Sequence, residues 1–158
     1  ARPIENISGD NTKENILTIL NKYGVSQSSD GDVRVELWGS GIPMREFLWS
    51  EDMADATVFV METINFLDLI SVIKGKEIRN THINVGTGIE ISIKDVANKI
   101  KDIIGFSGTL WFNTDKPDGT MRKLTDVSKL NSLGWKHKVS IDEGLEKLYK
   151  WYKKELLY

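Results

Sequence analysis

The chain has 158 residues, no cysteine and a formal net charge of -2. A near-neutral chain argues against nucleic-acid binding, because a duplex-binding surface carries a clear basic excess. The absence of cysteine excludes disulfides, thiolate zinc sites and cysteine nucleophiles within these residues. No apolar run reaches the roughly 18 residues that span a bilayer, and no signal peptide opens the chain. We therefore expect a cytoplasmic protein without a membrane partner, and the start at Ala1 rather than methionine suggests a fragment.

The first 32 residues predict one short helix between turns. Asp10 or Asn11 is suited to cap this helix, and apolar side chains recur at helical spacing from Ile16 onward. Gly24 fits the left-handed residue that follows a last helical turn. Residues 26–32 are polar and rich in serine and aspartate, which favours a loop.

Residues 33–61 predict two strands and an apolar helix. Residues 33–38 alternate apolar and polar side chains, which is the pattern of a half-buried strand, and residues 45–49 predict a second short strand. Ser50 is suited to cap a helix that ends near Met61. This helix is apolar almost all round. We therefore expect it to pack on more than one side, either between two layers or against a part of the protein beyond this chain.

The middle of the chain predicts a loop, a strand and a well-capped helix. Residues 65–80 favour a loop with one helical turn, and residues 82–90 favour a strand that runs into a glycine turn. Ser92 and Asp95 have the spacing of a capping box. They precede an apolar helical face that Gly105 ends.

The last third of the chain predicts one strand and two helices. Residues 108–112 favour the strand, Asp126 is suited to cap a short helix, and Ser140 with Glu143 forms a capping box before the final helix. Opposite charges at i, i+4 predict two ion pairs on the final helix, Glu143–Lys147 and Glu146–Lys150. Its apolar positions, which we expect to be buried, are Ile141, Leu145, Leu148 and Tyr152. The whole pattern predicts a mixed α/β fold.

The stretch from Trp38 to Arg45 contains more than a bare turn needs. Its two glycines allow a backbone to approach a ligand closely, and Trp38 offers a flat apolar face to a base or sugar ring. The planar guanidinium of Arg45 suits a diphosphate. The alternative is a hairpin with a packed tryptophan and a solvated arginine, and composition alone favours that alternative.

Two further turns are candidates for anion binding. Residues 84–88, NVGTG, look like a phosphate loop, but their spacing does not match the dinucleotide fingerprint, so an ordinary turn is the favoured interpretation. In the KPDG turn, Asp118 is suited to accept hydrogen bonds from sugar hydroxyls, and Arg122 or Lys123 to bind phosphate. The alternative there is a Pro-Asp-Gly turn with ordinary surface charges.

Three segments together resemble the GDP-L-fucose synthase family, a branch of the extended short-chain dehydrogenases/reductases. They read VELWGSGIPMREFLWSEDMADA, INVGTGIEISIKDVANKI and KPDGTMRKLTDVSKLNSLGW, and they stand in the family's order within residues 33–151. The resemblance implies an enzyme that converts GDP-4-keto-6-deoxy-D-mannose to GDP-L-fucose. It does so by epimerisation at C3 and C5, followed by reduction at C4 with NADPH.

The resemblance covers only the family's C-terminal part, which holds the GDP-sugar. The family's N-terminal Rossmann domain holds NADP and the catalytic residues, so the resemblance implies no catalytic, cofactor-binding or metal-binding residue in this chain, and no activity of the chain alone. It implies four substrate contacts. Trp38 would lie against the nucleotide-sugar, Arg45 would bind diphosphate oxygens, and Asp118 and Lys123 would bind the GDP part.

The resemblance also implies a division of the chain. Residues 1–32 would be an insertion with one short helix, and residues 33–158 would be the C-terminal nucleotide-sugar-binding domain, in which about 50–88 supply the last helix and strand of the Rossmann sheet. Surface normally covered by the Rossmann domain would then be exposed, which favours a homodimer. Two other interpretations stay open: a stand-alone nucleotide-sugar-binding module, and a fragment of another nucleotide-sugar epimerase or dehydratase.

Overall fold

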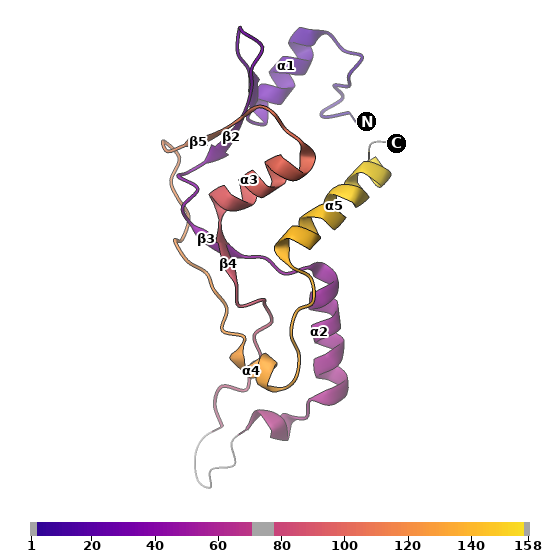
Figure 1. Ribbon diagram of the computed structural model, residues 1–158, viewed down its shortest axis with the longest axis vertical. Coiled ribbons are helices and arrows are strands. Elements are labelled where there is room, and N and C mark those ends of the chain that lie inside the picture. Colours follow the sequence, from indigo (N-terminus) through magenta and orange to yellow (C-terminus); the bar gives the residue numbers. More distant parts are fainter. Residues whose placement is uncertain (1–2, 71–77, 157–158) are drawn as a thin grey trace. The chain divides into compact units, whose positions relative to one another are not determined.

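The computed structural model describes residues 3–70 and 78–156, and it has the mixed α/β fold that the sequence predicts (Figure 1). Two compact units make up the chain. The first comprises Ala1–Met44, Ile91–Arg122 and Asp142–Tyr158, and the second comprises Arg45–Glu90 and Lys123–Ile141. Within the described residues, no helix is both long and apolar enough to cross a bilayer. The elements in chain order are α1 (Lys13–Lys22), β1 (Val25–Gln27), β2 (Val33–Trp38), β3 (Met44–Glu46), α2 (Ser50–Thr63), the 3-10 turn η1 (Phe66–Leu69), β4 (Glu90–Ser92), α3 (Ile93–Ile104), β5 (Thr109–Asn113), α4 (Ser128–Ser132) and α5 (Ile141–Leu156).

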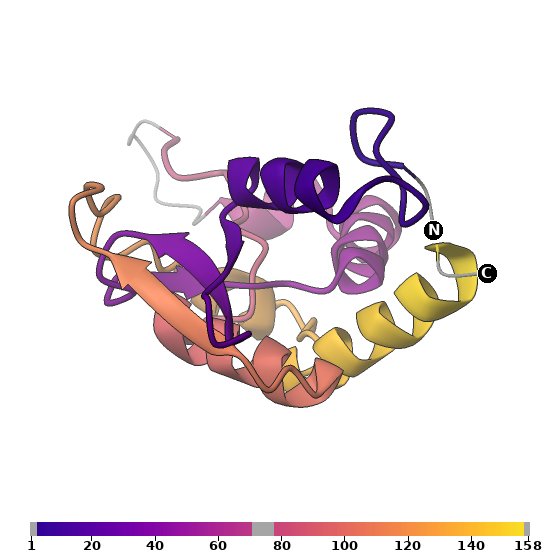
Figure 2. The ribbon, with the colours of Figure 1, turned by 90° about the horizontal axis from the view of Figure 1, so that it is seen from above.

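A three-stranded sheet, ordered β1-β2-β5, forms the framework of the first unit. β1 pairs antiparallel with β2, and β2 pairs parallel with β5, so that Trp38 lies opposite Asn113 at the end of the ladder. Figure 2 shows β2 and β5 side by side. The predictions of strands in 33–38 and 108–112 are confirmed. β1 falls partly within the predicted loop of residues 26–32, because its pairing with β2 is a tertiary interaction that local composition does not report.

The predicted cap of α1 is wrong by one or two residues. Thr12, rather than Asp10 or Asn11, caps the helix, and its Oγ1 accepts a hydrogen bond from the Asn15 N–H at 3.3 Å. The side chain of Asn11 is engaged in the turn before the helix, where its Oδ1 accepts from the Ser8 N–H at 2.9 Å. A side chain that already closes a turn cannot also cap the helix.

The Ser92 cap and the Gly105 end predicted for α3 are confirmed, but the Asp95 carboxylate accepts from the Ser92 hydroxyl at 2.6 Å and does not form the second half of a capping box. The burial predicted for α5 is partly wrong. The Asp95 N–H donates to Ser92 Oγ at 3.0 Å, and Gly105 has a φ of 69°. On α5, Leu148 and Tyr152 are 50% and 44% exposed. They line an apolar groove of about 740 Å³ formed with α3, so the apolar face of α5 is only partly covered. Both predicted ion pairs are present, Glu143–Lys147 at 2.8 Å and Glu146–Lys150 at 3.6 Å.

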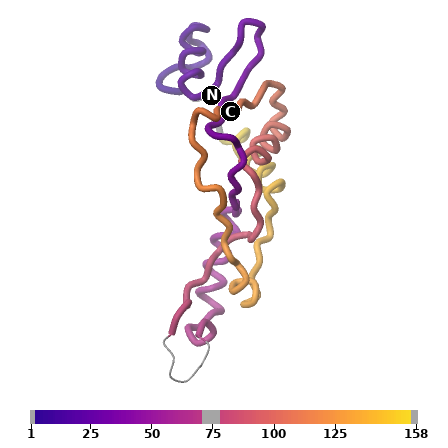
Figure 3. Tube along the Cα trace, turned by 90° about the vertical axis from the view of Figure 1, so that its left-hand side faces the viewer, coloured from indigo at the N-terminus to yellow at the C-terminus, as the bar shows by residue number. Residues whose placement is uncertain are grey.

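The second unit is built on α2. Figure 3 shows this helix, residues 78–90 and the stretch that contains α4 running side by side. Ala56, Leu130 and Trp135 form the buried core of the unit. Other apolar side chains of α2 remain exposed within this chain, including Met53 at 44%, Val58 at 51% and Met61 at 79%. The partly buried residues that complete the core are Leu48, Phe59, Val60, Ile83 and Val85.

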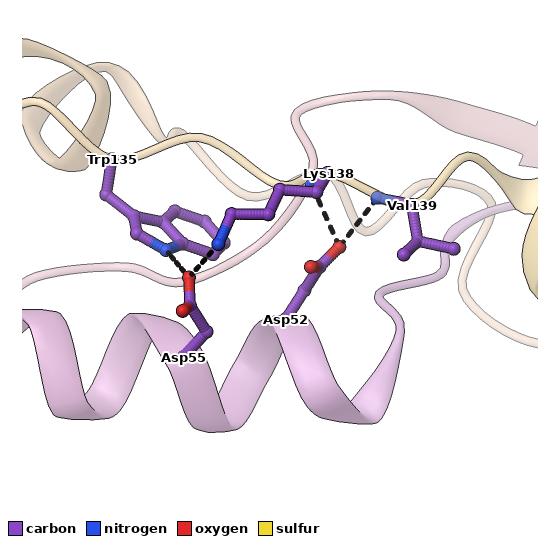
Figure 4. A network of polar contacts seen from close by, with 5 residues as sticks. All are labelled: Asp52, Asp55, Trp135, Lys138 and Val139. Atoms are coloured by element: carbon purple, nitrogen blue, oxygen red, sulfur yellow. Dashed lines mark hydrogen bonds and ion pairs between the residues drawn. The ribbon is translucent and has the colours of Figure 1, made fainter.

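Two aspartates of α2 fasten the loop after α4 to the helix (Figure 4). Asp52, which is only 3% exposed, accepts hydrogen bonds from the backbone N–H groups of Lys138 and Val139 at 3.0 and 2.9 Å. Asp55 accepts from Trp135 Nε1 at 2.8 Å and from Lys138 Nζ at 3.0 Å. The Trp135 indole N–H and then the Lys138 ammonium lower the pKa of Asp55 below its ordinary value. These contacts hold Trp135 in the core.

Two predictions at the start of the second unit are wrong. Ser50 is the first residue of α2 rather than its cap; the cap position belongs to Trp49, which makes no capping side-chain hydrogen bond. Strand β3 spans Met44–Glu46 instead of 45–49. The apolar residues 47–49 follow the strand instead of extending it, and Leu48 packs against the core of the unit.

The strand predicted for 82–90 is also absent, since residues 78–89 are irregular and β4 begins only at Glu90. The polar groups here bind side chains and other loops rather than a neighbouring strand: Asn84 Nδ2 donates to the Asp126 carbonyl at 3.0 Å. The helical turn predicted within 65–80 is confirmed as η1, and residues 71–77 of that prediction lie outside the described residues.

Candidate functional site

The turn after Trp38 needs its glycines for contacts within the protein. Gly39 and Gly41 have φ angles of +83° and +77°, in the left-handed region that favours glycine. A Cβ at Gly39 would overlap the carboxylate of Asp118, and one at Gly41 would lie 2.5 Å from a ring carbon of Phe112. The two glycines therefore allow β5 and the KPDG turn to pack closely against the turn after Trp38.

Asp118 joins the two candidate turns of the first unit. Its Oδ1 accepts from the Ser40 N–H at 2.8 Å, and its Oδ2 accepts from the Ser40 hydroxyl at 2.6 Å. The hydroxyl and then the backbone N–H lower the pKa of Asp118 below its ordinary value. A carboxylate has about four acceptor positions, so two hydrogen bonds to Ser40 still leave capacity for an outside donor.

Trp38 is the most open aromatic side chain near these turns, with 73% of its surface exposed. The ammonium of Lys116 lies 5.3 Å from the centroid of its ring, within the range of a cation–π interaction. The first unit thus brings Trp38, Lys116 and Asp118 together: a flat apolar face, a cation and a carboxylate around one turn.

Arg45 and Lys123, the other two candidates, belong to the second unit. Arg45 is partly buried on β3, and it interacts with other groups of the chain. Lys123 is exposed, two residues before Thr125. Both are close in sequence to residues of one hydrogen-bonded cluster: Arg45 directly precedes Glu46, and Lys123 stands two residues before Thr125, which donates to Glu46.

Glu46 fills the glycine turn that looks like a phosphate loop. Its Oε1 accepts from the N–H groups of Thr87 and Gly88 at 2.6 and 2.5 Å, and from the Thr87 hydroxyl at 3.2 Å. Its Oε2 accepts from the Thr125 N–H at 3.3 Å. A Cβ at Gly86 would lie 2.6 Å from Oε1, so a larger residue there would displace the carboxylate from its present position. The backbone N–H groups that could have held a phosphate are used by the protein's own carboxylate.

The pKa of Glu46 reports the same environment. Its partial burial acts to raise the pKa, because it disfavours the charged form. The hydrogen bonds from Gly88, from the Thr125 side chain and backbone and from Thr87 outweigh that effect, and the pKa falls below its ordinary value. Glu46 is therefore ionised at neutral pH.

Residues 3–86 match the sequence profile of a family described as the NAD dependent epimerase/dehydratase family. The chain belongs to this family. The matched region contains β2, the glycine turn, β3 and α2.

Known members of this epimerase/dehydratase family resemble the chain over most of its length. The putative GDP-L-fucose synthase 2 of Arabidopsis thaliana is 42% identical over 134 residues, which are 85% of this chain and 37% of that protein. A GDP-6-OMe-4-keto-L-xylo-heptose reductase from C. jejuni has a similar structure, with a TM-score of 0.79 and 47% identity over 92% of this chain and 39% of its own. A GDP-mannoheptose C4 reductase from Campylobacter jejuni, determined with NADP bound, has a TM-score of 0.73 and 46% identity over 90% of this chain and 38% of its own. The chain therefore spans little more than a third of the relatives it matches.

Two residues of the candidate site in this family member were not predicted from the sequence. Lys116 lies in the predicted KPDG turn, and only the fold brings its ammonium to the indole of Trp38. Glu46 follows Arg45 directly, and its partners lie 41, 42 and 79 residues further along the chain. An acidic residue beside a candidate arginine is the one local signal that could have drawn attention to it.

Proposed function

We propose that this chain is the GDP-sugar-binding part of a GDP-L-fucose synthase. The observation that carries the proposal is the pair of hydrogen bonds from Ser40 to Asp118, which joins the tryptophan turn and the KPDG turn at an exposed aromatic face. The 42% identity to the putative GDP-L-fucose synthase 2 of Arabidopsis thaliana supports it.

Each of the four proposed contacts has a physical role. Trp38 would stack on the nucleotide-sugar, since an exposed indole gains by covering its apolar face. Arg45 would bind two diphosphate oxygens with its planar fork, and Lys123 would add a second positive charge. Asp118 would accept hydrogen bonds from hydroxyl or amino groups of the GDP part with the acceptor capacity that Ser40 leaves.

The proposed reaction of the whole protein is epimerisation at C3 and C5 of GDP-4-keto-6-deoxy-D-mannose, followed by reduction at C4 with NADPH. The candidate phosphate turn is a poor site for NADP, because its Thr87 and Gly88 N–H groups donate to Glu46. We therefore assign NADP and the catalytic groups to other parts of a longer protein, and we expect no turnover from these 158 residues alone. Turnover by the purified chain would contradict this assignment.

A second candidate is a reductase that acts on the C4 ketone of a GDP-linked heptose. It is favoured by the 47% and 46% identities to two reductases from C. jejuni, which extend over 92% and 90% of the chain. Both candidates use a GDP-linked sugar, and they differ in the sugar. Comparing the two 4-keto sugars as substrates of a longer protein that contains this chain would separate them, and faster turnover of the heptose would replace our first candidate.

Calorimetric titration of the 158-residue chain tests the binding function directly. We expect GDP-mannose and GDP to bind, and UDP-glucose and dTDP-glucose to bind at least about tenfold more weakly, which is about 1.4 kcal/mol. Equal affinity for the three bases would remove the assignment to GDP. Absence of binding by any of them would remove the proposal that this chain holds the nucleotide-sugar.

A further inference from the structure

The carboxylate of Glu46 connects the segment that carries Arg45 to the segment that carries Lys123. The strand β3 supplies Glu46 itself, the turn at residues 86–88 supplies two N–H groups to Oε1, and the Thr125 N–H reaches Oε2. Arg45 immediately precedes Glu46, and Lys123 stands two residues before Thr125. One carboxylate thus fixes three pieces of chain that are distant in sequence.

We call the hydrogen bonds from Thr87, Gly88 and Thr125 to the Glu46 carboxylate the clamp. The clamp does not use the basic side chains of Arg45 and Lys123. Successive side chains of a strand point to opposite faces, so Arg45 is directed away from the carboxylate that follows it. Backbone N–H groups stabilise the negative charge of Glu46. The same hydrogen bonds give these N–H groups an acceptor, which a partly buried turn needs. Glu46 therefore need not compete with an anionic ligand for the guanidinium.

We propose that Glu46 is a positioning residue, whose carboxylate holds the strand of Arg45 in register with the segment of Lys123 so that both cations face one diphosphate. The part of this proposal that names the diphosphate rests on the proposed function. The clamp itself rests on the hydrogen bonds of Glu46.

The first test measures the affinity of the 158-residue chain for GDP by calorimetry in Glu46→Gln, a substitution that keeps the shape. One end of the Gln amide is a donor, so it would face an N–H group and break the contact on that side. We expect about a tenfold loss of affinity, and about threefold or less in an Arg45→Ala background, because residues that act together are not additive. Glu46→Asp keeps the charge but shortens the reach, and should fall between wild type and Glu46→Gln.

Asp52→Asn is the matched control. Asp52 is also a carboxylate of the second unit that accepts two backbone N–H groups, but the segment it holds, Lys138 and Val139, carries no proposed contact. We expect Asp52→Asn to lower stability and leave the GDP affinity of the folded protein unchanged. If Glu46→Gln behaves in the same way, Glu46 is structural only and the proposal is overturned. If Glu46→Gln does not fold, unchanged affinity in Glu46→Asp overturns it instead.

A second readout does not depend on the ligand. The Nε–H signal of Arg45 in a nitrogen-15 NMR spectrum should be sharp and separate in the wild type and broadened or shifted in Glu46→Gln, while Asp52→Asn leaves it in place. If the wild-type chain does not bind GDP, the proposed function fails, and with it the diphosphate. In that case, a shift of the Arg45 signal in Glu46→Gln would still support the positioning of Arg45 by Glu46, and an unchanged signal would overturn it.

Discussion

Glu46 and Asp118 are both carboxylates that accept backbone N–H groups, but they hold different kinds of structure. Asp118 binds both donors of one residue, Ser40, and so joins two exposed turns. Glu46 binds three backbone N–H groups from two segments, in a partly buried position. At the scale of single residues, negative charges therefore organise the loops on which the proposed cationic and aromatic contacts stand.

Arg45 gives the most direct test of the proposed contacts. A bidentate interaction with diphosphate is charge-assisted, so we expect Arg45→Ala to weaken GDP-mannose binding by about 1.5–3 kcal/mol, or about 10- to 150-fold. Arg45→Lys should recover only part of the loss, because it keeps the charge without the fork. Calorimetry gives the affinity, and thermal unfolding of the same variants gives the stability. A lower melting temperature with unchanged affinity would make Arg45 a structural residue.

The junction between Ser40 and Asp118 should depend on pH. Because the folded-state pKa of Asp118 is lowered, its contribution is complete above the unfolded pKa, which is near 4 for aspartate, and is lost as the pH falls through the lower folded value. We expect the fluorescence of Trp38 to change in this acidic range, as the turn loosens. The difference between the titrations of the wild type and of Trp38→Phe isolates that signal. Asp118→Asn should remove the acidic step, and a step that persists in it would belong to another carboxylate.

At the scale of elements, prediction from the sequence succeeded for both ends of α3, although the equally local cap predictions for α1 and α2 were wrong. α3 has its Ser92 cap and its Gly105 end because a capping side chain and a left-handed glycine act within one turn. The strand predicted for 82–90 failed because a strand needs a partner, and the N–H groups of Thr87 and Gly88 bind a side chain instead. The candidate residues were identified by the resemblance of their motifs, whereas Lys116 and Glu46 depend on contacts that only the fold creates.

The attachment of the loop after α4 to α2 is a further property at this scale. Asp52→Ala would leave the N–H groups of Lys138 and Val139 without their acceptor at a site where the carboxylate is 3% exposed. We expect the free energy of unfolding to fall by about 1–3 kcal/mol. Urea unfolding monitored by tryptophan fluorescence measures it. Glu51→Ala is the control, since it removes an exposed carboxylate from the same helical turn, whose Oε2 accepts from Trp49 Nε1 at 3.0 Å, and it should lower stability less than Asp52→Ala does. Equal losses would show that the helix N-terminus, rather than the loop contact, is responsible.

For the whole molecule, the central fact is that the chain spans 37% of the relative with which it shares 42% identity. Such a part need not cover its own apolar surface. The described residues of α2 leave Met53, Val58 and Met61 substantially exposed, and in the first unit a groove of about 740 Å³ lies between α3 and α5. Exposed apolar patches of this kind are typical of protein–protein interfaces.

We therefore expect the purified chain to associate with itself as its concentration rises, with α2 contributing to the contact. Met61 is 79% exposed, and covering its side chain in a contact is worth on the order of 1.4 kcal/mol, so Met61→Lys should weaken association about tenfold. Sedimentation velocity over a range of concentrations gives the association constant. Ser29→Lys adds the same charge at an exposed position outside α2 and controls for simple repulsion between copies. If both lysine variants weaken association equally, the effect is electrostatic. If Met61→Lys leaves it unchanged, the contact is made by another surface, and the same measurement on Leu148→Lys, in the groove beside α3, decides whether it is that one.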